Sequence, residues 1–181
     1  MWRAPSRLQP RTSWPRMRRI DGVMSEAPYF HIAVLVPDLA EAILRFGDVL
    51  ELDFADPIRA RIPQVIEGGV TEEVEVSVTY SRQGPPHFEL IEATGDGVFS
   101  ADRGYGVHHV GAWMEDTGAF TDRLSQLGIG VEMTFGTDVT RMGAYFNPKD
   151  LFGVRFEACP VAIRDGWGRW VRGDPGEPPA P

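Results

Sequence analysis

Cysteine is almost missing from this chain of 181 residues, because Cys159 is the only one. A single cysteine excludes both an intrachain disulfide and a zinc site built from several thiolates. We expect Cys159 to be a small buried side chain rather than a nucleophile. Chains without disulfides are typical of a reducing compartment, so the sequence predicts a cytoplasmic protein.

Long apolar runs and positive charge are also scarce. No stretch approaches the roughly 18–20 apolar residues that a membrane-spanning helix needs, so no membrane partner is expected. Lysine occurs once, at Lys149, and the formal net charge is −8. A nucleic-acid binder needs a basic face to displace counterions, which argues against a nucleic-acid partner. A phosphate-cradling glycine loop is missing as well.

The two ends of the chain differ from its middle. Residues 1–27 are rich in arginine and proline and show no hydrophobic period, which predicts a disordered extension. Met24 is the expected initiator, in preference to an organelle transit peptide upstream of it. Residues 162–181 form a predicted C-terminal tail rich in Gly, Pro and Trp. Trp167 and Trp170 are expected to pin the first part of this tail onto the body.

An internal repeat between these ends predicts the fold. Each copy opens with a strand-like run, an aspartate that can cap a helix, and an amphipathic helical pattern. Three further strand-like segments follow in each copy. The predicted strands are 29–38, 54–59, 74–82 and 87–93 in the first copy and 107–116, 131–136, 142–147 and 154–159 in the second, with helices at 39–50 and 117–127.

The predicted class is therefore α+β, with two tandem βαβββ modules. The first module covers residues 28–93 and the second covers 106–161, within one domain of residues 28–161. A single module of this size buries too little apolar surface to be stable alone. We expect the two to form one curved mixed sheet, a cup, with the helices on its convex face.

Strand alternation selects the candidate site residues. In the first strand His31 shares its face with Ala33 and Leu35, and this face is predicted to line the cup. In the second copy His109 takes the equivalent position, which places His108 on the opposite face. His108 is therefore read as structural or as a neighbour of the site, and His87 is read in the same way.

The last strand of each copy carries a matching glutamate, Glu89 and Glu157, between apolar neighbours. A carboxylate in such a strand is costly unless it is paired or bound to a metal. Pseudo-twofold symmetry is expected to bring both glutamates to His31 and His109. Two imidazoles and two carboxylates suit one divalent ion, namely Zn²⁺, Fe²⁺, Co²⁺, Ni²⁺ or Mn²⁺. Glu92 is expected to face solvent.

Further side chains are candidates for holding a substrate. Tyr80, Trp113 and Tyr145 are predicted to line an apolar pocket, although core packing is the alternative for at least one of them. An acidic substrate would need cationic anchors. The candidates are Arg82, Arg103, Arg141 and Arg155, of which Arg155 has a second interpretation as the counter-charge of Glu157.

Four motifs resemble the vicinal oxygen chelate superfamily, the glyoxalase/bleomycin-resistance/extradiol-dioxygenase group. They begin at His31 (HIAVLVPDL), Phe88 (FELIE), His108 (HHVGA) and Gly153 (GVRFE). Within the superfamily the chain is most similar to methylmalonyl-CoA epimerase and glyoxalase-like proteins. The resemblance implies His31, Glu89, His109 and Glu157 as metal ligands, with Glu157 also a proton carrier. Epimerases often have glutamine where Glu89 stands, whereas glyoxalase I has glutamate.

The predicted function is a divalent-metal-dependent isomerase or epimerase acting at the carbon α to a carbonyl through a metal-stabilised enolate. The catalytic residues are predicted to be Glu157 and Glu89. The alternatives are a glyoxalase I-type lyase, an extradiol-type dioxygenase and a non-catalytic small-molecule or drug-binding protein. The expected partners are a small carbonyl substrate, with an acyl thioester implied by the resemblance, and a second copy of the chain in a homodimer.

Overall fold

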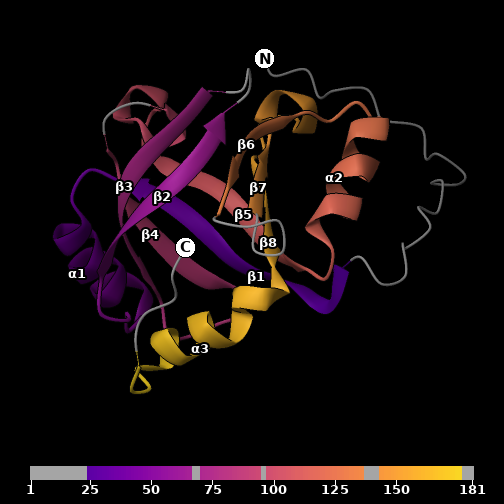
Figure 1. Ribbon diagram of the computed structural model, residues 1–181. Coiled ribbons are helices and arrows are strands. Elements are labelled where there is room, and N and C mark those ends of the chain that lie inside the picture. Colours follow the sequence, from indigo (N-terminus) through magenta and orange to yellow (C-terminus); the bar gives the residue numbers. More distant parts are fainter. Residues whose placement is uncertain (1–23, 67–69, 95–96, 137–142, 177–181) are drawn as a thin grey trace, which may run out of the picture.

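A computed structural model describes residues 24–66, 70–94, 97–136 and 143–176. Over these residues the chain forms one eight-stranded curved sheet with helices packed on its outside (Figure 1). The predicted α+β class is confirmed. No helix among the described residues is long and apolar enough to cross a membrane.

The repeat is present as two βαβββ modules. The first consists of β1 (Met24–Val36), α1 (Leu39–Leu50), β2 (Ile58–Ile66), β3 (Val70–Tyr80) and β4 (His87–Glu92). The second consists of β5 (Gly106–Met114), α2 (Thr117–Gln126), β6 (Val131–Phe135), β7 (Gly143–Phe146) and β8 (Phe156–Pro160). The predicted caps are confirmed, because the Asp38 and Asp116 carboxylates accept hydrogen bonds from the first turns of α1 and α2.

The strand order explains how two modules make one interior. It runs β1-β4-β3-β2-β6-β7-β8-β5, and the β1–β5 pairing closes the ring. The first and last strands of each module are parallel neighbours, β1 with β4 and β5 with β8. The sheet therefore curves further than the expected cup and encloses a central space.

Alternation along β1 separates the inner and outer sides of the sheet as predicted. Ala33 and Leu35 join an inner cluster with residues of β3, β4 and β6. Val34 and Val36 pack outward against α1. Figure 1 shows α1 and α2 on opposite outer sides of the sheet. The prediction that the helices cover the convex face is confirmed.

A β-bulge corrects the predicted facing of His108. Ala33 pairs with His109 and Val34 pairs with Val107, so His108 is an extra residue in β5. A bulge places two residues opposite one and breaks the strict alternation of side chains. The His108 ring accordingly lies against the His109 ring, and its prediction onto the opposite face was wrong.

Several element boundaries differ from the prediction. β1 already begins at Met24, so the expected start of the first module at residue 28 falls inside it; residues 1–23 lie outside the described part of the chain. β2 begins four residues later than expected and runs on through Pro63. Pro63 cannot donate to a ladder, and it lies where β2 pairs with β3 alone.

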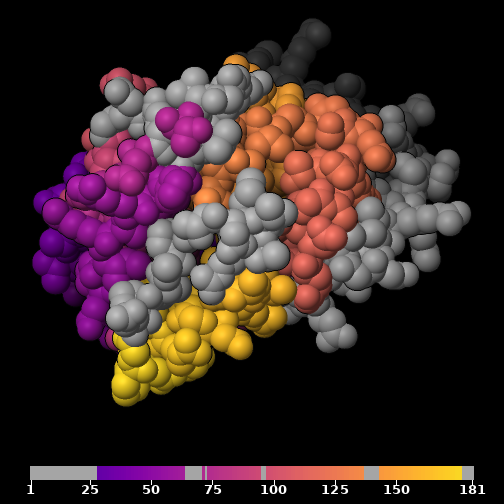
Figure 2. Space-filling model, in the orientation of Figure 1, coloured from indigo at the N-terminus to yellow at the C-terminus, as the bar shows by residue number. Residues whose placement is uncertain are grey.

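The predicted tail contains a helix that the sequence analysis did not anticipate, α3 (Arg164–Arg172). It follows a short 3-10 turn, Val161–Ile163, directly after β8. Trp167 and Trp170 fix it to the body as expected. Trp167 packs against Phe30, and the Trp170 indole donates a 3.0 Å hydrogen bond to the Asp56 carbonyl. In the space-filling view α3 (yellow) forms the lower edge of the face shown (Figure 2).

Candidate metal centre

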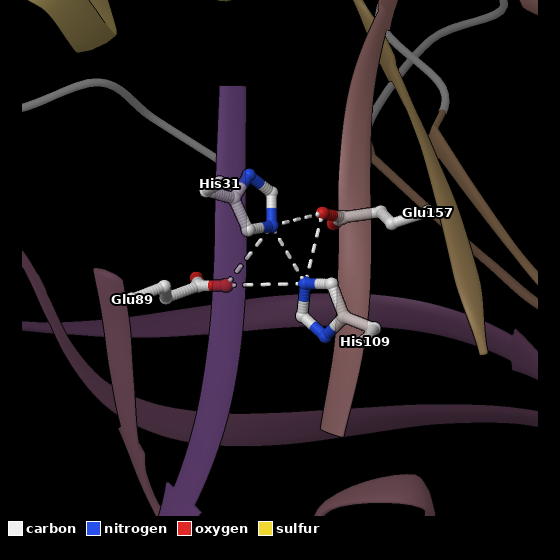
Figure 3. A group of neighbouring side chains, drawn as sticks. All are labelled: His31, Glu89, His109 and Glu157. Carbon is white, nitrogen blue, oxygen red and sulfur yellow. Dashed lines mark hydrogen bonds and ion pairs between the residues drawn. The ribbon is translucent and has the colours of Figure 1, made fainter. Parts of the chain in front are cut away.

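Four strands each supply one side chain to a buried cluster inside the sheet (Figure 3). His31 comes from β1, Glu89 from β4, His109 from β5 and Glu157 from β8. The parallel β1–β4 and β5–β8 pairs place each glutamate one strand away from a histidine. The β1–β5 pairing then joins the two halves. The sequence prediction that these four residues meet is confirmed, and one chain supplies all of them.

The donor atoms converge on one point. The two Nε2 atoms of His31 and His109 are 2.8 Å apart. From His31 Nε2, Glu89 Oε2 lies at 3.2 Å and Glu157 Oε2 at 2.9 Å. From His109 Nε2 the same oxygens lie at 3.1 and 3.0 Å. An ion with ligand bonds of about 2.0–2.2 Å spaces its neighbouring ligand atoms by about 3 Å. The spacing therefore fits a single divalent ion.

The inward oxygens of the cluster also lack conventional partners. Glu89 Oε2 and Glu157 Oε2 are buried and make no hydrogen bond, although both are within ion-pair distance of the imidazoles. Buried acceptors without donors are costly unless a cation satisfies them. The donor set thus fits a borderline divalent ion on chemical grounds as well as by spacing.

The pKa values of the four groups describe their protonation states in the absence of a metal. Burial lowers the pKa of His31, but the negative charges of Glu89 and Glu157 at ion-pair distance outweigh it and raise the pKa to about 9. The pKa of His109 is raised in the same way by Glu157. Burial raises the pKa of Glu89, but His31 and His109 bring it down to about 2. Protons on the imidazoles then balance the carboxylates.

Each glutamate also has a tyrosine beside it on the neighbouring strand. The Tyr80 hydroxyl donates a 2.5 Å hydrogen bond to Glu89 Oε1, and Tyr145 is the cross-strand neighbour of Glu157. Burial and the carboxylate charges raise the pKa of both phenols well above 10, so both stay protonated. Tyr80, one of the two tyrosines predicted to bind substrate, therefore fixes the Glu89 carboxylate, and Tyr145 lies in the equivalent place beside Glu157.

His108 contacts the cluster through His109. Its Nε2 is 2.8 Å from the Val98 carbonyl oxygen, which can only accept, so Nε2 carries the proton. Burial and the neighbouring positive charges of His109 and Arg155 lower the pKa of His108 to about 4, so its ring is neutral. Nδ1 of His108 is then an acceptor for the His109 Nδ1–H, 2.8 Å away. These two hydrogen bonds leave Nε2 of His109 pointing into the cluster.

The other predicted residues have varied outcomes. Trp113 lines the cavity beside the cluster and stacks on Phe30, with ring centroids 3.8 Å apart. His87 has a structural contact, because its Nδ1 is 2.7 Å from the Ser81 carbonyl. Glu92 is half-buried rather than turned to solvent, and it accepts a 3.3 Å hydrogen bond from the first residue of α1.

The arginines predicted as substrate anchors serve other contacts. Arg155 pairs with Glu132 at 2.7 Å, so its interpretation as the counter-charge of Glu157 was wrong. Arg103 pairs with the same Glu132 at 2.8 Å. Arg82 donates a 2.7 Å hydrogen bond to the Val171 carbonyl of α3. Arg141 lies outside the described residues.

The sequence analysis missed the contribution of α3 to the cavity. Trp167 and Trp170 both line it, next to residues of the sheet. Their spacing, followed by the buried Val171, is the i, i+3, i+4 pattern of an amphipathic helix. This pattern could have revealed the helix within a segment read as a tail because of its glycines.

Known proteins show the same family and fold. A family model described as Glyoxalase/Bleomycin resistance protein/Dioxygenase superfamily matches residues 30–146. The solved methylmalonyl-CoA epimerase of Mycobacterium tuberculosis is 18% identical and has a TM-score of 0.57, covering 80% of this chain and 93% of its own. No curated protein matches the sequence.

Two other solved structures are similar. A hypothetical protein of Bacillus halodurans C-125 is 16% identical with a TM-score of 0.57, covering 75% of this chain and 95% of its own. A Streptomyces coelicolor methylmalonyl-CoA epimerase variant in complex with 2-nitronate-propionyl-CoA is 19% identical with a TM-score of 0.53, covering 75% and 98%. At these identities the likeness to solved structures concerns the fold.

Proposed function

The chain belongs to the Glyoxalase/Bleomycin resistance protein/Dioxygenase superfamily, and on that premise we propose that it is a divalent-metal-dependent isomerase or epimerase. It moves a proton at the carbon next to a carbonyl group. One observation carries the proposal: the buried His31–Glu89–His109–Glu157 cluster forms part of the wall of a cavity, which both glutamates line. A small carbonyl compound in that cavity lies directly against two carboxylates.

The four cluster residues would hold the ion. When bound, a divalent ion supplies Lewis acidity that polarises a carbonyl and stabilises the negative charge formed on its oxygen. The residues of the chain supply proton transfer. Figure 3 shows Glu89 and Glu157 approaching the cluster from opposite sides. One carboxylate can take a proton from one face of the substrate carbon while the other returns a proton to the opposite face.

The tyrosines prepare the glutamates for this role. Tyr80 holds one oxygen of Glu89 by its hydroxyl, which leaves the other oxygen directed at the cluster. Tyr145 stands in the equivalent place beside Glu157. A carboxylate fixed in this way keeps its reacting oxygen aligned with the substrate carbon. The apolar walls keep water away from the carbanion-like species that forms.

The proposal also covers the compartment and the oligomeric state of the protein. We place the protein in the cytoplasm and expect a homodimer, in which each copy has its own complete site. The solved epimerases include one in complex with methylmalonyl-CoA and NH4+, so an acyl thioester is one substrate class to test. A dioxygenase is a weaker alternative, because iron enzymes of that kind use two histidines and one carboxylate.

A glyoxalase-type lyase is the nearest alternative, since it begins with the same proton abstraction. A non-catalytic binder is a second one, favoured by the apolar lining of the cavity. The two differ in their need for the cluster. A binder retains its ligand when Glu157 and Glu89 become glutamines, whereas an isomerase or lyase loses its reaction.

The test is solvent-exchange with purified protein in deuterated water. The protein is stripped of metal, reloaded separately with Zn²⁺, Co²⁺, Ni²⁺, Mn²⁺ or Fe²⁺, and incubated with a panel of carbonyl compounds that includes methylmalonyl-CoA. We expect deuterium at the carbon α to the carbonyl, with at least one metal and not in the stripped protein. Glu157→Gln is expected to lower the exchange rate at least 100-fold.

Product analysis then separates the alternatives. A changed configuration at the same carbon identifies an epimerase, whereas a proton delivered to the neighbouring carbon identifies glyoxalase chemistry. Dioxygen consumption without deuterium incorporation would replace the proposal by oxygenation. Stoichiometric ligand binding that needs neither metal nor the glutamates would replace it by a non-catalytic binder.

A further inference from the structure

The cavity beside the cluster has an almost entirely apolar wall. Apart from Glu89 and Glu157, each described residue that lines it is aliphatic, aromatic, methionine or cysteine. The aliphatic part comes mainly from β2 and β3, and the aromatic part comes from seven different elements. The aromatic side chains other than tyrosine are Phe30, Phe99, Trp113, Phe135, Trp167 and Trp170.

Strand alternation keeps positive charge out of this wall. Along β2 the side chains of Ile58, Ala60 and Ile62 line the cavity. Arg59 and Arg61, which alternate with them, are exposed on the other face and pair with glutamates of β3; Arg61 reaches Glu73 at 3.3 Å. β2 and β3 therefore line the cavity with aliphatic side chains and form their ion pairs on the opposite face.

The arginines near the site are also committed elsewhere. Arg155 is buried and held by Glu132, and Arg82 is bonded to the main chain of α3. Neither side chain lines the cavity. An anionic group bound at the end of the cavity away from the cluster would therefore meet apolar surface and no positive charge among the described residues. Burying a charge without a partner costs far more than burying an apolar group of the same size.

The cavity also limits the size of what it encloses. Its volume is about 120 Å³. One water molecule needs roughly 10–15 Å³ of such volume, so the enclosed part holds roughly ten water-sized groups, and the cavity is partly open beyond it. Trp167 and Trp170 of α3 close one side of it, and the Trp170 hydrogen bond to Asp56 fixes the helix in that place.

We propose that the site takes a carbonyl compound with an uncharged, mainly apolar body, either aromatic or branched aliphatic. The body packs between the β2–β3 aliphatic side chains and the two α3 tryptophans. The carbonyl end faces Glu89 and Glu157, and this orientation rests on the function proposed above. An anionic substituent on the body is excluded from the apolar part of the cavity, away from the cluster.

The test compares isosteric ligands on the metal-loaded full chain. The probes are 2-hydroxypropiophenone and its para-methylsulfonyl and para-sulfonate derivatives. The two derivatives are of nearly equal size and differ from each other in charge, and the smaller parent compound carries neither substituent. Affinity is measured by titration calorimetry, with tryptophan fluorescence as a second readout. We expect the methylsulfonyl compound to bind at least tenfold more tightly than the sulfonate. Equal binding of the two, or failure of the uncharged ketones to bind, overturns the proposal.

Variants locate the binding to this cavity. Trp170→Ala is expected to weaken binding of 2-hydroxypropiophenone about tenfold, whereas Trp170→Phe keeps an aromatic ring and stays within about threefold. Leu44→Ala is the matched control, because Leu44 is 69% exposed on α1 and distant from the cavity wall. Equal effects of Trp170→Ala and Leu44→Ala would also overturn the proposal.

Exchange in deuterated water separates this inference from the proposed function. Preferential binding of the uncharged ketone without any deuterium uptake contradicts the proposed reaction but supports the proposed ligand class. Deuterium uptake restricted to methylmalonyl-CoA or to the sulfonate supports the proposed reaction and contradicts the proposed substrate class. Uptake by the uncharged ketone, lost in Glu157→Gln, supports both.

Discussion

The neighbouring rings of His108 and His109 share one hydrogen bond between their Nδ1 atoms, 2.8 Å long. The β-bulge makes this contact, since two successive side chains of a regular strand would point to opposite faces. The far side of His108 is fixed by the Val98 carbonyl. A backbone oxygen outside the cluster thus determines which nitrogen of His109 faces the proposed ion.

Replacing His108 should therefore weaken metal binding without removing a ligand. We expect His108→Phe to lower the affinity for Zn²⁺ roughly 10–100-fold, as is usual when the residue that orients a metal-binding histidine is lost. Affinity is measured by competition with a chelator. His87→Phe is the matched control, because the His87 ring bonds to the Ser81 carbonyl, although His87 is the cross-strand neighbour of His31. Equal losses in both variants would contradict the assigned role.

Gly111 is predicted to be the position at which the smallest change blocks the site. A Cβ atom there would lie 1.9 Å from Cε1 of His31, so the imidazole would have to move. We expect Gly111→Ala to lower metal affinity more than tenfold and to destabilise the fold by about 1–3 kcal/mol. Thermal unfolding with and without Zn²⁺ measures both effects.

The control for this change is Gly130→Ala. Its added Cβ would meet no atom closer than 3.5 Å, an ordinary contact. That variant should keep the full metal-induced rise in the unfolding temperature. A Gly111→Ala protein that is stabilised by Zn²⁺ as much as the unchanged protein would contradict the predicted packing of His31.

Metal binding should release protons at neutral pH. The pKa of His31 is raised to about 9 in the metal-free protein, so at pH 7 its imidazole is protonated. An ion needs a bare Nε2, and binding must displace that proton. Apparent metal affinity is therefore expected to rise with pH up to about 9 and then level off. Calorimetry in two buffers of different ionisation enthalpy measures the released protons.

The same raised pKa affects the stability of the metal-free protein. A group whose pKa is higher in the folded than in the unfolded state stabilises the fold below the unfolded value and loses that effect as pH rises through the folded value. For His31 the loss runs from about 6.5 to about 9. Denaturant unfolding across this range should show falling stability without metal and a flatter profile with Zn²⁺. A flat profile for both forms would contradict the paired arrangement.

The buried Arg155–Glu132 pair gives a pH dependence of the opposite sign. Burial raises the pKa of Glu132, but Arg155 and Arg103 outweigh it and lower the pKa. The stabilisation is present above the usual pKa near 4.5 and is lost as pH falls through the lowered value. We expect Arg155→Met to cost about 1–3 kcal/mol at pH 7, the same at about pH 5, and progressively less below about pH 4.5.

Arg103→Met tests whether burial is the cause of that cost. Arg103 binds the same carboxylate, but its side chain is half exposed, so its loss should cost less than about 1 kcal/mol. Both variants are compared by urea unfolding at pH 7, at about pH 5 and at about pH 3, which brackets the titration of Glu132. A larger effect of Arg103→Met than of Arg155→Met would contradict the assignment of the main contact to Arg155.

Much of the fold and the composition of the cluster could be predicted because the sequence repeats. Each position in one copy could be compared with the equivalent position in the other. His31 and His109 stood at equivalent places, and Glu89 and Glu157 did so on the last strands. Periodicity also identified both main helices and their caps. These features depend on local pattern and on pairing between neighbouring strands, which a sequence displays directly.

What the sequence could not show depends on register and on distant contacts. One extra residue in β5 turned His108 inward, and nothing in the pattern of β5 marks a bulge there. Arg155 shares the strand parity of Glu157, yet it pairs with Glu132 of β6, which is not the strand next to β8. The closure of the sheet and the placement of α3 over the cavity likewise arise from long-range packing.

Because the donor atoms are divided between the two modules, the complete site can form only after the second module has been synthesised. During synthesis the first module emerges with His31 and Glu89 only, and the last donor, Glu157, follows 68 residues after Glu89. One imidazole and one carboxylate make a weak chelate. Metal capture should therefore come after β8 has docked beside β5, which makes the bound ion a marker of completed chains rather than a template for the first half.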